Sequence, residues 1–244
     1  GCLLGTAVGD SIGLPYEGLS PQRANKIFGL PERHRFVLGR GMISDDTEHT
    51  CMVAQSLIAS GFDAALFTNN FSWRLRFWLL RIPAGTGMAT LRAIIKLWIG
   101  INPNKSGVFS AGNGPAMRAA ILGASIDDPK LLRQLVKAST IITHTDPKAE
   151  FGAYSIALAA QMSSQNETVV IDSYINQLEE QLGQEGNELI ALLINAAISS
   201  KNGESTESFA ISMGLSKGVT GYVYHTVPIA IHAWFTHPHD IKMA

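Results

Sequence analysis

Residues 87–100 read GMATLRAIIKLWIG, and their apolar side chains recur at the three- and four-residue intervals that mark one face of a helix. The face is formed by Leu91, Ile94, Ile95 and Trp98. Similar spacing recurs along most of the chain, whereas the strict alternation of a half-buried strand is scarce. The sequence therefore predicts an all-α fold.

Ten segments carry helical periodicity or the signals that start and stop helices. We expect helices at residues 45–60, 72–82, 87–100, 115–123, 130–141, 147–163, 168–182, 186–200, 204–213 and 228–236. Pro115, Pro147 and Pro228 each suit the first turn of a helix, where the missing N–H has no partner to lose. Because no internal repeat or Pro/Ser-rich linker divides the chain, we expect one compact multi-helix domain over residues 1–244.

Two segments, residues 14–43 and 101–114, do not fit a helical pattern and are rich in Gly, Pro, Asn and Arg. Long irregular segments in compact helical domains often carry functional sites. We therefore expect the site to lie in or beside these segments.

The composition limits the class of protein. Charged residues make up 16% of the 244 residues and hydrophobic residues 46%, which excludes a disordered chain. A formal charge of −1 supplies no field that attracts polyanions or anionic membranes, so we expect neither nucleic acid nor membrane as a partner. The two cysteines do not make a disulfide scaffold, and no uncharged apolar run reaches the ~18 residues of a membrane span. We expect a cytosolic protein.

The sequence SDDTE at residues 44–48 precedes a largely apolar helix. Asp45 at the N-cap with Glu48 three residues later would form a capping box, and early carboxylates favour the helix dipole. One carboxylate suffices for that role, whereas adjacent Asp45 and Asp46 with a hydroxyl on each side offer the clustered oxygens that Mg²⁺ or Mn²⁺ prefers. The local pattern alone favours the cap over the metal site.

Gly5, Gly9 and Gly13 recur every four residues, which on a helix produces a smooth stripe that another backbone can approach closely. Close packing explains the glycines but not Asp10 and Glu17, two acids in a segment otherwise poor in charge. Glu17 is expected in a loop, where its carboxylate could face a cleft as a base or a movable metal ligand.

The sequence SAGNGPAMR at residues 110–118 could cradle an anion with the backbone N–H groups of Gly112 to Gly114. The Gly-Lys-Ser/Thr ending of a Walker loop is absent, and the pattern alone favours an ordinary turn with a helix cap. Further along, Asp146 is expected to cap a helix, and His144 lies just before it. A lone histidine is more often structural, but beside such a cradle it could donate to a ribose hydroxyl or a phosphate.

The stretch from Trp73 to Arg81 combines Phe77 and Trp78 with three arginines. It could form a base-stacking surface, although a buried helix whose arginines extend to solvent is the favoured interpretation. Cys2 and Cys51 have no obvious catalytic partner and no G-x-S-x-G motif occurs, so covalent catalysis is not expected.

In their order along the chain, these motifs resemble those of the ADP-ribosylglycohydrolase family, over nearly the whole sequence. The opening motif matches at Gly5, Gly9, Asp10, Gly13, Pro15 and Glu17, and the first metal motif at Ser44, Asp45, Asp46 and Thr47, with Ser44 where the family more often has threonine. The phosphate-and-ribose loop matches at Gly112, Asn113, Gly114, Met117 and Arg118, and the histidine motif at His144, Ala149, Gly152 and Ala153. Each motif is weak alone, but four in order are specific and reverse the preference against a metal at Asp45 and Asp46.

The resemblance implies an all-α fold that holds two Mg²⁺ or Mn²⁺ ions at the base of a cleft for ADP-ribose. It implies hydrolysis of the N- or O-glycosidic bond between ADP-ribose and a protein side chain or small molecule, by a water that the metals orient. Ser44, Asp45 and Asp46 would be metal ligands, and Glu17 and Asp46 would be catalytic. The substrate would be bound by Asp10, Ser110, Gly112, Asn113, Gly114, Met117 and His144. The acceptor, whether arginine, serine or a small molecule, is not specified by these motifs.

The sequence departs from the family in one respect. The family closes its metal site with a late Gly-Asp-x-Asp-Thr motif, but beyond Asp146 this sequence has only Asp172 and Asp240, which form no such pair. Because Tyr222 to Phe235 resembles the helix that precedes this motif, we expect the protein to continue beyond Ala244. A real loss would collapse metal affinity, and the alternative is then a non-catalytic ADP-ribose-binding or crystallin-like structural member.

Overall fold

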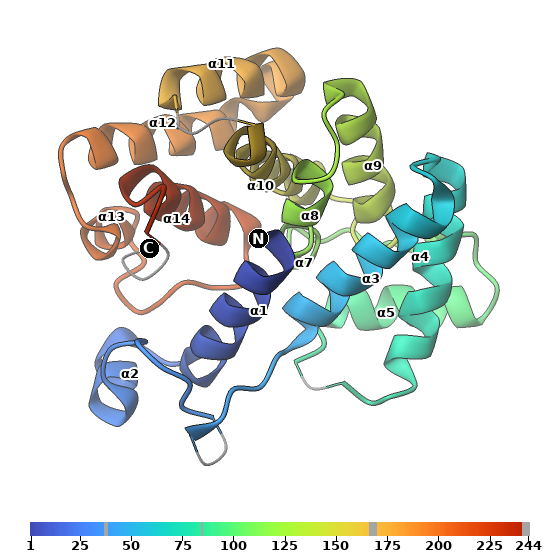
Figure 1. The fold of residues 1–244 in the computed structure, drawn as a ribbon, viewed down its shortest axis with the longest axis horizontal. Helices are drawn as coiled ribbons and strands as arrows, with labels where there is room; N and C mark the ends of the chain where they lie inside the picture. Colours follow the sequence, from blue (N-terminus) through green and yellow to red (C-terminus); the bar gives the residue numbers. More distant parts are fainter. Residues whose placement is uncertain (37–38, 84, 166–169, 241–244) are drawn as a thin grey trace.

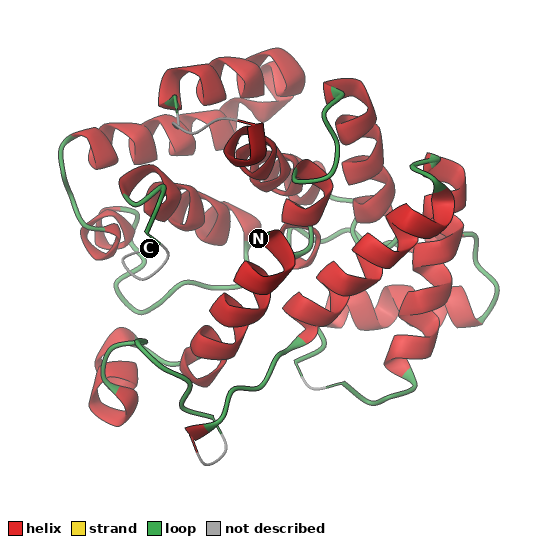
Figure 2. Cartoon of the chain, viewed as in Figure 1, coloured by secondary structure: helices red, strands yellow, loops and turns green. Residues whose placement is uncertain are grey.

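The computed structural model describes residues 1–36, 39–83, 85–165 and 170–240, which are arranged as helices and loops (Figure 2). No strand forms within those ranges, and isolated backbone bridges link Val108 to His144 and Gly112 to Tyr222. The predicted all-α fold is therefore confirmed. No helix in the described ranges is both long enough and apolar enough to cross a membrane.

The helices are labelled in chain order in Figure 1. The α-helices are α1 Cys2–Gly13, α2 Pro21–Phe28, α3 Asp45–Ser60, α4 Ala64–Leu79, α5 Met88–Trp98, α6 Pro103–Ser106, α7 Gly114–Met117, α8 Ala120–Gly123, α9 Pro129–Ile141, α10 Pro147–Gln165, α11 Ile171–Leu182, α12 Asn187–Lys201, α13 Thr206–Ser212 and α14 Val223–Thr236. Two 3₁₀ turns, η1 Leu14–Tyr16 and η3 Gly183–Gly186, precede α2 and α12. Most of these bounds lie within a few residues of the expected ones.

Four helices in the first half of the chain differ from the sequence-based expectation, and one of them, α1, was not among the ten expected segments. The helix expected at 72–82 starts earlier, at Ala64, because the side chain of Asp63 caps its first turn. Helices α2 and α6 lie inside the segments that were expected to be irregular. Each opens with a proline behind a polar cap, Ser20 for α2 and Asn102 for α6. Both are too short for apolar periodicity to indicate them.

Further differences occur in the second half. Pro228 lies inside α14 and not in its first turn. A proline there removes one helical hydrogen bond, but Val227 and Ile231 are each only 1% exposed, so burial of the apolar face holds the helix in place. The helix expected at 115–123 is divided into α7 and α8. The expected start at residues 168–169 lies outside the described residues.

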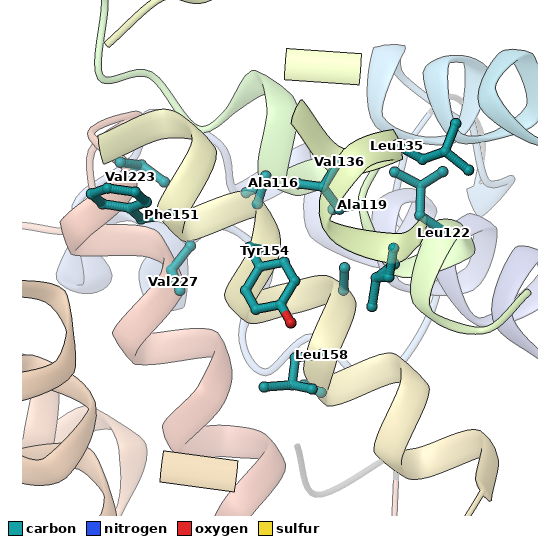
Figure 3. Packing of buried hydrophobic residues seen from close by; sticks show 14 of the residues in the cluster. Ala116, Ala119, Leu122, Leu135, Val136, Phe151, Tyr154, Leu158, Val223 and Val227 are labelled. Atoms are coloured by element: carbon teal, nitrogen blue, oxygen red, sulfur yellow. The ribbon is translucent and has the colours of Figure 1, made fainter. Parts of the chain in front are cut away.

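Helix α10 is the centre of the fold, with α7, α8, α9, α11 and α14 packed around it. Figure 3 shows side chains of this core meeting, among them Tyr154 and Leu158 of α10 and Val227 of α14. Helix α8 approaches α10 so closely that a Cβ atom at Gly123 would lie 1.8 Å from the carbonyl oxygen of Ala157. This packing fixes α7, and with it the segment that leads into α7, against the core.

Helix α1 lies beside α3, as Figure 1 shows. The expected close packing of a backbone against the glycine stripe of α1 is wrong for the described chain. A Cβ atom at Gly5, Gly9 or Gly13 would meet no atom of another segment within 4 Å. The neighbouring Leu4 and Val8 are 74% and 43% exposed, so this face of α1 is open.

Candidate active site

The N-terminus of α3 carries the adjacent aspartates. Ser44 is the N-cap, because its Oγ accepts the N–H of Asp46 at 3.3 Å, and Asp45 is the first helical residue. The expectation that Asp45 is the N-cap is therefore wrong. Glu48 does not complete a capping box, since its Oε2 accepts the indole N–H of Trp78 at 2.6 Å. With the cap supplied by Ser44, both aspartates are available for another role.

Asp10 joins α1 to this helix end. Its Oδ2 accepts the backbone N–H of Ser44 at 2.8 Å and that of Thr47 at 3.2 Å, and it also accepts the Thr47 hydroxyl. A carboxylate that receives three hydrogen bonds at a helix N-terminus satisfies donors that the helix itself cannot. The structure thus places the predicted substrate-binding residue Asp10 where it positions the SDDTE segment.

Burial and neighbouring carboxylates raise the pKa of three acids at this corner, Asp46, Asp45 and Glu17. The pKa of Asp46 is raised to about 7, mainly by burial and also by the charges of Asp45, Asp10 and Glu17. The pKa of Asp45 is raised to about 6, mainly by burial and also by the charges of Glu17, Asp10 and Glu48, while a hydrogen bond from its own backbone N–H lowers it. The pKa of Glu17, in the loop after η1, is raised by burial and by Asp10. A cation placed among these carboxylates would relieve their repulsion.

The donor set partly fits a divalent metal ion. Its oxygens are of the kind that Mg²⁺ and Mn²⁺ prefer, and their mutual repulsion favours a cation. Within the described residues, however, no three His, Cys, Asp or Glu side chains are arranged to hold a metal. Ser44, Asp45 and Asp46 therefore remain predicted ligands, and they would supply only part of a coordination shell.

The loop after α4 closes one side of this corner. Gly85 has φ +81°, and a Cβ atom there would lie 3.2 Å from Oδ1 of Asp45. A side chain at this position would both strain the backbone and press on the carboxylate. No feature of the sequence indicated this neighbour of Asp45.

The glycine-rich segment before α7 is fixed between two other loops. The N–H of Asn113 donates to the carbonyl of Gly221 at 2.9 Å, and the N–H of Val223 donates to Ala111 at 2.9 Å. The N–H of Gly112 donates to the Ser110 hydroxyl at 3.3 Å. Two of the three amides predicted to face an anion are therefore already engaged. The helix that follows is also a single turn, so its dipole contributes little.

His144 lies on the glycines of this segment. Cβ atoms at Gly112 and Gly114 would lie 3.0 Å from its Nε2 and Cε1 atoms. Burial, together with the nearby charge of Arg118, lowers the pKa of His144 to about 3, so the imidazole is neutral at physiological pH. His144 therefore faces the glycine-rich segment as a neutral ring.

Hydrogen bonds indicate which nitrogen of His144 carries the proton. Nδ1 lies 2.8 Å from the Thr143 hydroxyl, which accepts from Arg118 Nη2 at 2.8 Å. The Thr143 hydroxyl can donate its own proton either to the carbonyl of Thr140 at 3.5 Å or to Nδ1 of His144 at 2.8 Å. The shorter contact favours Nδ1 as the acceptor. Nε2–H is then the donor directed at the glycines, and donation from His144 to a ribose hydroxyl or a phosphate stays a prediction.

Arg118 is a functional candidate that the pattern analysis matched to a motif but gave no role. It is fully buried and forms no ion pair with any described carboxylate; neutral groups of Ser139 and Thr143 accept its hydrogen bonds. Burial lowers its pKa to about 9, and the charge of Asp45 opposes this shift. The Nε2 atom of His49, whose Nδ1 lies 3.3 Å from Arg118, is buried without a partner in the described chain. A buried cation of this kind favours anions nearby.

The acidic corner and the glycine-rich segment are neighbours in the structure. Helix α3 packs against α7, and the Thr50 hydroxyl of α3 contacts the carbonyl of Met117 at 3.4 Å. The two sets of predicted residues therefore form one region, with Met117 and Arg118 between them. Asp172 lies elsewhere, in an ion pair with Lys201 at 2.8 Å.

Known proteins resemble this chain in sequence and in fold. A family model described as ADP-ribosylglycohydrolase matches residues 1–244. The chain is 30% identical over 207 residues to ADP-ribosylhydrolase ARH3 of Gallus gallus, which covers 73% of this chain and 53% of that protein. It is 32% identical over 162 residues to ADP-ribosyl-(dinitrogen reductase) glycohydrolase of Rhodospirillum rubrum, covering 62% of this chain and 52% of that protein.

An uncharacterized protein of Archaeoglobus fulgidus is 33% identical over 165 residues, covering 65% of this chain and 53% of that protein. The chain thus spans about half the length of these curated relatives. A solved structure described as an ADP-ribosylglycohydrolase-related protein complex aligns with a TM-score of 0.64 at 22% identity, covering 100% of this chain and 76% of that chain. At that identity the likeness shows the fold.

Proposed function

The chain belongs to the ADP-ribosylglycohydrolase family, and on that premise we propose that it hydrolyses the N- or O-glycosidic bond between ADP-ribose and an acceptor. One observation carries the proposal: α3 packs against α7, so that the four mutually repelling acids adjoin the segment covered by His144. The first region suits the reacting ribose, and the second suits the rest of ADP-ribose. We further propose a cytosolic location, which suits the two free thiols, Cys2 and Cys51.

The proposal assigns Mg²⁺ or Mn²⁺ to Ser44, Asp45 and Asp46. When bound, such ions would supply positive charge at the ribose hydroxyls and an ordered water. The protein's own part is to hold the two aspartates on a capped helix end, through Ser44 and Asp10. Glu17 lies in an adjoining loop, and its raised pKa makes it a stronger base than an ordinary glutamate, which suits a general base.

The remainder of ADP-ribose is assigned to the glycine-rich segment. His144 would donate from Nε2 to a phosphate or ribose oxygen, held in that tautomer by Thr143. The lack of a side chain at Gly112 and Gly114 makes room for the ring of His144, because a Cβ atom at either position would lie 3.0 Å from it. Arg118 is buried behind Thr143 and would not contact the ligand. Its positive charge, which no described carboxylate pairs with, would favour the diphosphate electrostatically.

A second candidate is a non-catalytic member that binds ADP-ribose or serves as a crystallin-like structural protein. The absence of a three-ligand metal group among the described residues favours it. The two candidates differ in what a divalent metal does. Turnover would require it, whereas binding through His144 and the glycine-rich segment would not.

Release of ADP-ribose from modified arginine and serine peptides, measured with Mg²⁺ or Mn²⁺ and with EDTA, tests the proposal. We expect release that EDTA and Asp46→Ala abolish, while Asp172→Ala, far from the site, leaves it unchanged. Calorimetric titration with ADP-ribose distinguishes the second candidate, which predicts binding without release under every metal condition. Release that persists in EDTA would remove the metal from the proposal.

A further inference from the structure

A groove lies between α3 and α4, beside the acidic corner. Its volume is about 570 Å³, and it is open to solvent along the two helices. The groove is lined by Ile43, Glu48, Cys51, Met52, Gln55, Asn70, Trp73, Arg74, Phe77, Trp78 and Arg81. The proposed function uses none of these side chains.

Aromatic rings are exposed along this groove. Trp73 is 49% exposed and Phe77 59% exposed, with their ring centroids 6.0 Å apart, and Trp98 of α5 meets the edge of Phe77. The expectation that this stretch is a buried helix is therefore wrong for one of its faces. Exposed tryptophan and phenylalanine beside arginine are the residue types that dominate protein binding sites.

The groove is also cationic. Arg74 and Arg81 form no ion pair with a carboxylate in the described chain. Glu48, the carboxylate among the lining residues, is engaged by the indole N–H of Trp78. Arg74 donates from Nη1 to Gln55 at 2.8 Å, while its Nε is buried with no partner among the described residues. The groove therefore complements an anionic group next to an apolar one.

One end of the groove is at the proposed reaction site. Ile43 and Glu48 line it from either side of the segment that contains Asp45 and Asp46. Arg81 is followed by Ile82, which is 89% exposed and has φ +52°. Three residues further on, Gly85 lies beside the carboxylate of Asp45. A left-handed conformation is strained for a β-branched residue, and such strain clusters at functional sites.

The length of the groove indicates the size of its occupant. The lining residues on α3 extend from Glu48 to Gln55, about 10 Å at ~1.5 Å per residue. A single arginine or serine side chain that leads away from the ribose would not fill that length. About three residues of an extended peptide would, at ~3.3 Å per residue.

We propose that this groove binds the acceptor protein, through an acidic segment with an aromatic or aliphatic residue that flanks the ADP-ribosylated side chain. The inference rests on the proposed function, and it selects protein conjugates over small-molecule conjugates as substrates. The apolar residue packs against Trp73 and Phe77, and the acidic residues pair with Arg74 and Arg81. Long-range attraction to these arginines also predicts that binding weakens with salt.

Binding of unmodified, fluorescein-labelled peptides tests the groove independently of catalysis. One peptide carries aspartates and a leucine around the acceptor position. The control peptide carries lysines in place of the aspartates and keeps the leucine. We expect anisotropy to show at least tenfold tighter binding of the acidic peptide, and Arg81→Glu and Phe77→Ala each to weaken it about tenfold. Arg92→Glu, an exposed charge reversal on α5 outside the groove, should leave it unchanged. Equal binding of both peptides, or equal effects of Arg81→Glu and Arg92→Glu, would overturn the proposal.

Turnover distinguishes the two proposals from each other. The same acidic peptide is ADP-ribosylated and compared with the isolated ADP-ribosylated amino acid of the same linkage. We expect Arg81→Glu to lower kcat/KM about tenfold for the peptide and to leave it within twofold for the amino acid. Hydrolysis of both substrates with equal sensitivity overturns the groove alone. Selective peptide binding with no hydrolysis of either substrate overturns the catalytic proposal and leaves the groove standing.

Discussion

Asp10 accepts the backbone N–H of Ser44 at 2.8 Å, so a carboxylate on α1 closes the N-terminus of α3. The same oxygen atom of Asp10 accepts the N–H and the hydroxyl of Thr47. The orientation of the segment between Ser44 and Thr47, which contains both aspartates, thus depends on a residue 34 positions away. The three predictions that concern the site follow from such connections.

Asp10→Ala should lower the free energy of unfolding by about 2–3 kcal/mol, because it leaves the donors of Ser44 and Thr47 without their charged acceptor. Urea denaturation of the metal-free protein measures the change. Asp10→Asn keeps the shape and one acceptor oxygen, so its loss should be smaller. An equal effect of the two substitutions would contradict the capping role.

Asp46→Asn should stabilise the metal-free protein at high pH. In the unfolded chain an aspartate titrates near ~3.9, whereas the pKa of Asp46 in the folded chain is about 7. Between these values the folded protein binds more protons than the unfolded chain, so the free energy of unfolding falls as pH rises. With allowance for solvent screening, the variant should gain on the order of 1–2 kcal/mol at pH 8 and nothing near pH 4.

Chemical denaturation in EDTA at both pH values checks this sign. Asp172→Asn is the matched control, because Asp172 lies in an exposed ion pair with Lys201 far from the acidic corner. The difference in the free energy of unfolding between Asp172→Asn and the wild type should be small at both pH values. If Asp46→Asn is no more stable than the wild type at pH 8, the result would contradict a raised pKa of Asp46 in the folded protein.

Thr143→Val should weaken ADP-ribose binding and alter the tautomer of His144. The substitution removes the hydroxyl that links Arg118 to Nδ1, which leaves one buried guanidinium donor unpaired and destabilises the protein by about 1–3 kcal/mol. Nitrogen-15 NMR of the imidazole reports the tautomer, and calorimetry reports the affinity. Thr143→Ser restores the hydroxyl and should recover both. A wild-type His144 protonated on Nδ1 would contradict the assignment.

The helices were predictable wherever a helix buries one face along several turns. Apolar spacing placed α5 and α9, and the helix expected at 45–60 has the same bounds as α3, which ends before Gly61 in a left-handed conformation. The start of α4 was missed because Asp63 sets it through a cap. We expected Pro228 in the first turn of a helix, but it lies inside α14. The sequence alone does not show that burial of the helix face offsets the hydrogen bond lost at the proline.

The site was predictable only in part. Asp45 and Asp46 together provide more carboxylates than a helix cap requires, and that excess is visible in the sequence. The role of Arg118 was not visible, because its partners Ser139 and Thr143 are 21 and 25 positions away. The glycine spacing of α1 was misinterpreted for a similar reason. Spacing shows that a backbone has room to approach, but not that one does.

Gly9→Ala and Gly123→Ala should therefore have opposite effects. At Gly9 no atom of another segment lies within 4 Å of a new Cβ, so alanine should stabilise the 244-residue chain by about 0.5–1 kcal/mol through its helix propensity. At Gly123 the new Cβ would lie 1.8 Å from the carbonyl oxygen of Ala157, so alanine should push α8 from α10 and cost about 3 kcal/mol or more. Urea denaturation compares the two. Destabilisation by Gly9→Ala would restore the packing interpretation of the glycine stripe.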